Sequence, residues 1–265
     1  TLDSAPSYNW TNATAYKDSG LFLIDDGDGT CKVFVDKSGN LGIGTATPTE
    51  KLHLNAGNFL QSPGDPVHVG AITDNATMEL DGARTIFISG KYAYVAADTD
   101  DGVEILDISD PSNPTHVGSI NDTTCDAANN DECMLDGARG IYVSGKYAYV
   151  AAISDDGVEI LDISDPSNPT HVGSITDDET TELNGAISIY VSGKYAYVAA
   201  RSDDGLEILD ISDPTNPTHV GAIGKSATVK LDSASDIYVS GKYAYVAATS
   251  DDGVEILDIS DPSNP

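Results

Sequence analysis

The stretch Lys-Tyr-Ala-Tyr-Val-Ala-Ala (residues 146–152), followed by Gly-Val-Glu-Ile-Leu-Asp-Ile-Ser-Asp-Pro (residues 157–166), decides the fold. Its first part recurs from Lys91, Lys146, Lys194 and Lys242, at intervals of 55, 48 and 48 residues. Each copy follows Ser-Gly, and three of the copies continue into Asn-Pro-Thr-His-Val-Gly. Internal repeats of this length indicate an array of similar supersecondary units.

Each repeat is expected to contain four short β-strands. Asp156-Gly157 supplies the positive φ of a tight hairpin, and the prolines of Asp-Pro-Ser-Asn-Pro interrupt a strand ladder. The second strand is apolar on both faces, so it must be covered on both faces, as in the stacked blades of a β-propeller. The strands of the second repeat are expected at Ile141–Val143, Tyr147–Ala152, Val158–Ile163 and His171–Ile175. The predicted fold is therefore all-β, a β-propeller-like array of four four-stranded repeats with a small N-terminal β segment.

Gly137 to Ala151 and Gly157 to Pro169 resemble the LVIVD repeat of secreted and surface-associated bacterial and archaeal proteins. The resemblance covers about residues 59–265 and implies a β-propeller. It implies no defined enzymatic activity and supplies no catalytic residues. The chain also contains no Gly-x-Ser-x-Gly, His-Glu-x-x-His or P-loop sequence, so we expect it not to be an enzyme.

The two ends of the repeat region do not match. Phe59 to Ile72 is a degraded copy of the end of a repeat, whereas the last repeat lacks its fourth strand. A strand at 67–72, with Val67, Val69 and Ile72 as candidate contact residues, could complete the last blade of its own chain and close a ring. Alternatively, it could complete the last blade of the next chain and produce a head-to-tail filament.

Residues 1–58 form a separate N-terminal segment, and residues 59–265 form the repeat domain. Gly20 to Asp36 predicts a hairpin around Asp-Gly-Asp-Gly, and Gly39 to Leu54 resembles a short stalk module of phage tail fibres and bacterial surface proteins. A segment this small cannot maintain a core alone, so it is expected to dock on its own propeller or on a neighbour. Its apolar run is a candidate donated strand: Leu21, Phe22, Leu23 and Ile24.

The charge balance argues against some partners. Thirteen Lys and Arg face 43 Asp and Glu, for a net charge of −30. Such a chain is repelled by nucleic acid and by anionic lipid, and no segment approaches the roughly 18 apolar residues of a membrane span. Much of the charge recurs with the repeat on turns and strand ends, where it discourages edge-to-edge pairing.

Three groups of residues are candidates for ligand binding. Asp25, Asp26 and Asp28 form an acidic cluster that could bind Ca²⁺ weakly, although Asp-Gly is also favourable turn chemistry. Arg84 and Arg139 precede the first strand of two repeats, where they could hold a carboxylate or a sugar in a central channel, or pair with surface Asp. The histidines share one repeat position and would be spread around a ring, which favours a structural role: His68, His116, His171 and His219.

The second repeat carries an insertion of seven residues with two cysteines, Cys125 and Cys133. They are expected to form a local disulfide in an oxidising compartment, because a zinc site needs four ligands and the sequence shows no neighbouring His or further Cys. Cys31 would be buried or paired between subunits. Glycosylation sequons occur at Asn9, Asn12, Asn75 and Asn121.

The sequence favours a non-enzymatic extracellular or cell-surface protein with a structural or adhesive role. Its expected partner is a second copy of itself, joined head to tail by strand exchange into a fibre, with glycans as further candidates. The alternative is a monomeric closed propeller that binds a glycan, Ca²⁺ or a partner protein.

Overall fold

The computed structural model describes residues 20–25, 31–36, 38, 40–43, 49, 51–54, 67–129 and 133–265. The chain divides into two compact units, Thr1–Val67 and His68–Pro265. No helix among the described residues has the length and apolar character that crossing a membrane requires.

The N-terminal unit contains one small sheet, in which the strands follow one another in chain order. The predicted hairpin is present as its first two strands, which pair antiparallel, and the third strand continues this pattern. The last strand instead runs parallel to the third. The strands are β1 (Gly20–Asp25), β2 (Cys31–Asp36), β3 (Leu41–Ile43) and β4 (Leu52–Leu54).

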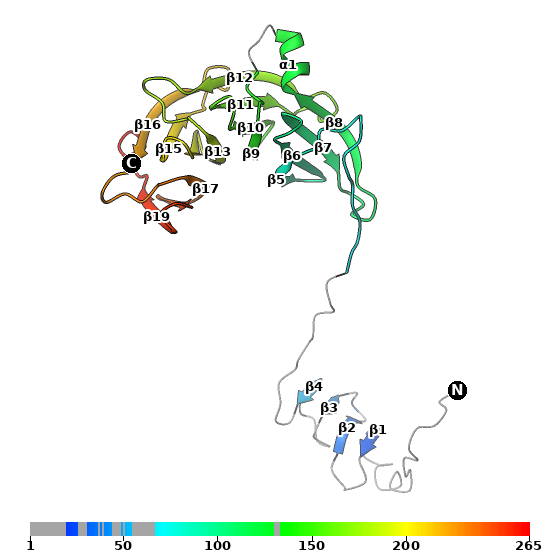
Figure 1. Ribbon diagram of the computed structural model, residues 1–265. Coiled ribbons are helices and arrows are strands. Elements are labelled where there is room, and N and C mark those ends of the chain that lie inside the picture. Colours follow the sequence, from blue (N-terminus) through cyan, green and yellow to red (C-terminus); the bar gives the residue numbers. More distant parts are fainter. Residues whose placement is uncertain are drawn as a thin grey trace. The chain divides into compact units, whose positions relative to one another are not determined.

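The repeats form four antiparallel sheets, here called blades 1 to 4 (Figure 1). Blade 1 comprises β5 (Ala83–Ser89), β6 (Tyr92–Ala97), β7 (Gly102–Asp107) and β8 (Thr115–Asn121). Blade 2 comprises β9 (Ala138–Ser144), β10 (Tyr147–Ala152), β11 (Gly157–Asp162) and β12 (Thr170–Thr176). Blade 3 comprises β13 (Ala186–Ser192), β14 (Tyr195–Ala200), β15 (Gly205–Asp210) and β16 (Thr218–Gly224). Blade 4 has three strands, β17 (Ala234–Ser240), β18 (Tyr243–Ala248) and β19 (Gly253–Asp258). The predicted fold class is confirmed.

In the hairpin between the second and third strand of each blade, the residue with positive φ is an aspartate and not the glycine that follows it. The residue with positive φ is Asp156 in blade 2, at 51°, whereas Gly157 already belongs to β11. Gly157 is required for a different reason, because a Cβ there would lie 2.7 Å from the Ile175 carbonyl oxygen of β12. The prediction of a tight Asp-Gly turn is therefore confirmed, with the conformational roles of the two residues exchanged.

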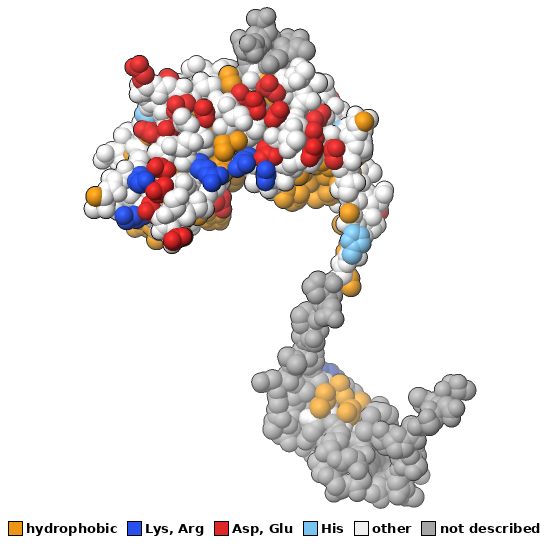
Figure 2. Space-filling view, in the orientation of Figure 1, with side chains coloured by type: hydrophobic (Ala, Val, Ile, Leu, Met, Phe, Trp, Pro, Cys, Tyr) orange, Lys and Arg blue, Asp and Glu red, His pale blue; other side chains and the backbone are white. Residues whose placement is uncertain are grey.

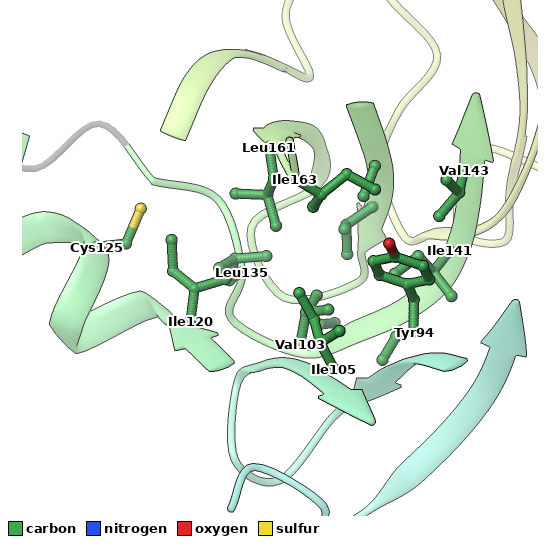
Figure 3. Packing of buried hydrophobic residues seen from close by; sticks show 14 of the residues in the cluster. Tyr94, Val103, Ile105, Ile120, Cys125, Leu135, Ile141, Val143, Leu161 and Ile163 are labelled. Atoms are coloured by element: carbon green, nitrogen blue, oxygen red, sulfur yellow. The ribbon is translucent and has the colours of Figure 1, made fainter. Parts of the chain in front are cut away.

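The core lies between the blades. Tyr94, Val103 and Ile105 of blade 1 pack against Ile141 and Val143 of blade 2 (Figure 3). The same arrangement recurs between blades 2 and 3 and between blades 3 and 4. The second strands are therefore buried on both faces, as their apolar sequence requires.

An aromatic row crosses the array along the first strands of the blades. Phe87 of β5, Tyr142 of β9, Tyr190 of β13 and Tyr238 of β17 have consecutive ring centroids 4.7, 4.9 and 5.0 Å apart. Such edge and tilted contacts are favourable aromatic geometries. The row ends at Tyr238, which is 60% exposed.

Two segments differ from their predicted structure. Residues 67–72 form no strand, although a strand was expected there, because no described strand lies beside them as a pairing partner. The insertion in the second repeat was expected to be a polar loop, but it begins with helix α1 (Asp122–Asn129). Asn121 caps this helix, since its Oδ1 accepts a hydrogen bond of 2.8 Å from the Thr124 amide.

Candidate functional site

The candidate site consists of the two open faces of the blade array. On blade 4, Val254 and Ile256 of β19 are 64% and 57% exposed. The residues at the same repeat positions in blades 1 to 3 are completely buried, because the next blade covers them: Val103, Ile105, Val158, Ile160, Leu206 and Ile208. The blade-4 face thus has the composition of a core without a covering blade.

Blade 1 presents the complementary face. Ile86 and Ile88 of β5 are 61% and 52% exposed, whereas Ile141 and Val143, at the same positions in blade 2, are each 7% exposed. A depression beside them is lined by Ile72, Leu80, Val95 and Leu106, among other residues. Figure 2 shows apolar side chains gathered along this edge of the repeat unit, while acidic side chains cover much of the surface around it.

A repeated hydrogen bond joins each blade to the next. The amides of Gly137, Gly185 and Ser233 donate to Oδ1 of Asp101, Asp156 and Asp204 of the preceding blade, at 2.9, 2.7 and 2.8 Å. The corresponding acceptor on blade 4 is Asp252, and the corresponding donor on blade 1 is the Gly82 amide. Within the described residues these two groups lack this bond, so each open face carries one half of it.

Each complete blade also contains a buried carboxylate and its histidine. The Nδ1 atoms of His116, His171 and His219 lie 2.6, 2.7 and 2.7 Å from Oε1 of Glu104, Glu159 and Glu207. Burial raises the pKa of Glu159 and of Glu207 to about 7, although the histidines oppose the shift. Three of the four histidines that share a repeat position, His116, His171 and His219, therefore pair with a buried glutamate of their own blade.

Blade 4 has the carboxylate of this pair without the histidine. Oε2 of Glu255 accepts a hydrogen bond of 2.8 Å from the Lys230 amide, as Glu104 does from Glu79 at 3.1 Å. The described residues place no fourth strand beside β19. The histidine at the matching repeat position is His68, which lies in the segment that precedes blade 1.

Gly70 and Ile72 contact blade 1 as the fourth strand of a preceding blade would. A Cβ at Gly70 would collide with the Pro111 carbonyl oxygen. A Cβ at Gly118 would likewise collide with the Pro166 carbonyl oxygen of the following blade. Gly173 and Gly221 have the same contact with the carbonyl oxygens of Pro214 and Pro262. Ile72 packs against Val95 and Leu106. Val67 and Val69 are 79% and 59% exposed.

The two arginines proposed as ligand-binding residues converge on one carboxylate. Arg84 Nε and Arg139 Nη2 lie 2.5 and 3.2 Å from Oδ2 of Asp98. Burial raises the pKa of Asp98, but the two guanidinium groups outweigh it and the net shift is downward. The two guanidinium groups thus share a single carboxylate within blades 1 and 2, which is the pairing alternative that the sequence left open.

Several other candidate residues lie outside the described part of the chain. These are Asn9, Asn12, Asp26, Asp28 and the side chains of Asp25, Cys31 and Leu21 to Ile24. Asn75 is exposed, and its Oδ1 accepts hydrogen bonds from the Thr77 amide and hydroxyl at 3.0 and 2.8 Å. Asn121 donates from Nδ2 to Glu79 at 2.9 Å, so this amide nitrogen already has a partner within the chain.

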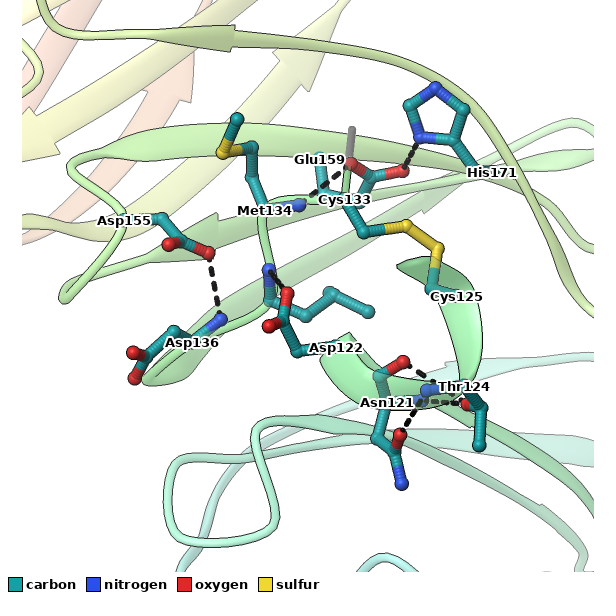
Figure 4. The surroundings of a disulfide bond; sticks show 11 residues. Asn121, Asp122, Thr124, Cys125, Cys133, Met134, Asp136, Asp155, Glu159 and His171 are labelled. Carbon is teal, nitrogen blue, oxygen red and sulfur yellow. Dashed lines mark hydrogen bonds and ion pairs between the residues drawn. A yellow bond between two sulfur atoms is a disulfide. The ribbon is translucent and has the colours of Figure 1, made fainter. Parts of the chain in front are cut away.

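The insertion carries the predicted disulfide and places it beside two side chains that the sequence did not connect with it. Cys125 and Cys133 are joined as a disulfide, and Glu159 and His171 of the same blade lie beside it (Figure 4). The sequence did not associate His171 with the cysteines because 38 residues separate it from Cys133. Strand pairing of β11 with β12 brings His171 to Glu159, and the Met134 amide, next to Cys133, bonds to the same carboxylate.

The family model of the LVIVD repeat matches residues 82–122, 137–177, 185–223 and 232–265. No curated protein matches the sequence.

Among solved structures, a putative 6-phosphogluconolactonase from Bacteroides uniformis is similar at 17% identity and a TM-score of 0.55, over 92% of this chain and 67% of the other. A functionally unknown protein from Desulfotomaculum acetoxidans is similar at 16% identity and a TM-score of 0.53, over 68% of this chain and 55% of the other. Hydrazine synthase of Kuenenia stuttgartiensis is similar at 17% identity and a TM-score of 0.51, over 74% of this chain and 51% of the other. The chain thus spans about half the length of the latter two structures. Their differing names attach no common activity to the shared fold.

Proposed function

This chain belongs to the LVIVD-repeat family, and we propose that it is a non-enzymatic structural subunit that joins copies of itself head to tail. Blade 4 of one copy would pack against blade 1 of the next. Residues 67–72 of that next copy would become a fourth strand beside β19. The observation that carries the proposal is the complementarity of the two open faces, each of which matches one side of the blade–blade contacts inside the chain.

The internal blades specify the pairing register of this contact. In blade 1, Val103 of β7 pairs with Ile120, Ile105 with Gly118, and Leu106 with His116. The same register in blade 4 would pair Val254 with Ile72, Ile256 with Gly70, and Leu257 with His68. It would also bring His68 Nδ1 to the Glu255 carboxylate and complete the fourth Glu–His pair.

The same arrangement would supply the other missing contacts. The Gly82 amide of the incoming copy would donate to Asp252, and Phe87 would continue the aromatic row beyond Tyr238. Ile86 and Ile88 would cover Val254 and Ile256. A fully buried Val or Ile side chain contributes about 1.5–3 kcal/mol relative to an exposed one, so these four residues would supply part of the free energy that offsets the cost of association, together with the added strand and its hydrogen bonds.

A contact between unlike faces either closes into a ring or continues as a filament. The filament is the form proposed here, in an extracellular or cell-surface setting. The paired Cys125 and Cys133 support that setting, because disulfides persist in oxidising compartments, and the exposed Asn75 sequon is compatible with a glycan. The repeated acidic surface favours solubility of the subunits and leaves the apolar faces for specific contact.

Electron microscopy and light scattering of the 265-residue chain test this proposal. The wild type is expected to form elongated particles whose mass increases with concentration. Val254→Asp, which places a charge in the proposed contact, should leave discrete monomers. Ala227→Asp adds the same charge on an exposed loop and should assemble like the wild type. Monomers of the wild type at high concentration would refute the proposal, and a particle limited to two chains would indicate a closed ring.

A further inference from the structure

The insertion in blade 2 holds a group of potential metal ligands that blades 1 and 3 do not have. Cys125 belongs to α1, Cys133 follows that helix, Glu159 lies on β11 and His171 lies on β12. One ligand atom from each of these residues lies within 4.8 Å of those of the other three. Cys125, Cys133 and Glu159 are 3%, 6% and 0% exposed, so the group is shielded from solvent.

In the structure the two sulfur atoms are bonded to each other, with the Cα atoms 6.0 Å apart. A disulfide sulfur is a poor metal ligand, whereas a thiolate is a strong one. Reduction of this bond would create two thiols beside a carboxylate and an imidazole. Two thiolate sulfurs, one imidazole nitrogen and one carboxylate oxygen are four ligands of the types that bind zinc in tetrahedral geometry.

We propose that the reduced chain binds a thiophilic divalent cation of the zinc class through Cys125, Cys133, Glu159 and His171. Zinc–sulfur and zinc–nitrogen bonds of about 2.3 and 2.0 Å require neighbouring ligand atoms roughly 3.3–3.8 Å apart. The longest observed separations, up to 4.8 Å, would therefore contract by about 1 Å, whereas the 2.7 Å between His171 Nδ1 and Glu159 Oε1 would lengthen by about 0.6 Å as their hydrogen bond is exchanged for the ion. The ion would replace the disulfide as the link between α1 and the blade.

The surroundings of the group favour a cation. Asp122 and Asp136 lie close to Asp155, whose pKa is raised to about 6 by burial and by these neighbouring carboxylates (Figure 4). The Met134 amide donates to Oε2 of Glu159 at 3.2 Å, which leaves Oε1 directed toward His171. Hydrogen bonds of this kind orient metal ligands and increase affinity.

The change from disulfide to metal site has a defined chemical balance. A dithiol reductant transfers two electrons and two protons to the Cys125–Cys133 bond and becomes a cyclic disulfide itself. The sulfur–sulfur bond breaks and two thiols form. On binding the cation, both thiols release their protons to solvent.

Cobalt titration of the folded chain tests this site, with Cys31→Ser as the background so that only Cys125 and Cys133 carry thiols. The protein is reduced with dithiothreitol, transferred to reductant-free anaerobic buffer and titrated with Co²⁺. We expect a thiolate-to-cobalt absorption band that saturates at a single equivalent and disappears when Zn²⁺ is added. Zn²⁺ should also protect both cysteines from alkylation, as measured by mass spectrometry. The oxidised chain should show neither effect.

Matched variants identify the ligands. His171→Ala should weaken Co²⁺ binding by about tenfold or more, as loss of groups that support a metal site does. His219→Ala is the control, because His219 occupies the same repeat position and pairs with Glu207 without a neighbouring cysteine. Circular dichroism establishes that each variant is folded. Absence of the band in the folded, reduced chain would overturn the proposal. Equal Co²⁺ affinity of the two histidine variants would do the same.

Discussion

Ile256→Ala is the most informative substitution, because the same residue type occupies the same repeat position in a buried setting at Ile160. Ile256 is 57% exposed and Ile160 is 0% exposed. The substitution removes three carbon atoms, which are worth about 2.4 kcal/mol at about 0.8 kcal/mol per buried methylene. If the head-to-tail contact buries the 57% that is exposed, it loses about 1.4 kcal/mol, or about tenfold in dissociation constant.

The same calculation gives separate expectations for the free energy of unfolding and for the free energy of association. The part of Ile256 that is already buried accounts for about 1 kcal/mol of folding free energy. Ile160→Ala, in contrast, should lower the free energy of unfolding by about 2–5 kcal/mol, because it leaves a cavity between blades 2 and 3. Its effect on association should be small, since Ile160 lies away from both open faces.

Sedimentation velocity over a concentration series measures the association, and denaturant unfolding of dilute protein measures the stability. The reasoning requires that Ile256→Ala weakens association much more than Ile160→Ala and destabilises the fold much less. Equal association of Ile256→Ala and wild type would show that the blade-4 face is not the contact.

Three further predictions concern the fold and its pH dependence. The pKa values of Glu159 and Glu207 are raised from 4.5 to about 7 in the folded chain. The contribution of these two groups to the free energy of unfolding should therefore be fully present below pH 4.5 and decrease as the pH rises toward 7. Glu159→Gln and Glu207→Gln should flatten that decrease in denaturant titrations at several pH values, and an unchanged slope would contradict the assignment. Gly157→Ala should cost about 1–3 kcal/mol because its Cβ would lie 2.7 Å from the Ile175 oxygen, whereas Gly224→Ala, which meets no atom within 4 Å, should have little effect on the melting temperature. Lys146→Ala should leave the melting temperature nearly unchanged, since its 2.7 Å ion pair with Asp162 is on the surface, and a clear decrease would show that the pair has a structural role.

Most of the fold could be predicted from the sequence, because each repeat combines short apolar strands with Gly, Asp and Pro residues at the turns between them. It correctly placed Tyr147–Ala152 as a strand, and its strand limits at Val158–Ile163 were one residue late at each end. Which residue of Asp156-Gly157 has positive φ could not be read from the sequence, because both residue types tolerate that conformation. The structure assigns the positive φ to Asp156, while close approach of the Ile175 backbone excludes a side chain at position 157.

The candidate site was predictable only in part. The unequal ends of the repeat region indicated that the fourth strand of blade 4 and the segment 67–72 belong together. The sequence could not show on which side of the array that segment lies, since this depends on the contact of Gly70 with Pro111. The cluster of Cys125, Cys133, Glu159 and His171 was missed for the same reason. Ligands that come from a helix, a loop and two strands become neighbours only after blade 2 has formed.

Disulfide trapping in the proposed register tests the head-to-tail contact most directly. In a Cys31→Ser chain, Ile72→Cys combined with Val254→Cys places two thiols opposite each other, at the positions where Val103 faces Ile120 in blade 1. Ala71→Cys combined with Val254→Cys is the control, because neighbouring strand residues point to opposite faces. Mild oxidation followed by non-reducing electrophoresis should produce a ladder of covalent multimers from the first pair and not from the control. A cross-linked monomer would instead show that the segment completes the last blade of its own chain, and the absence of any specific cross-link would contradict strand exchange altogether.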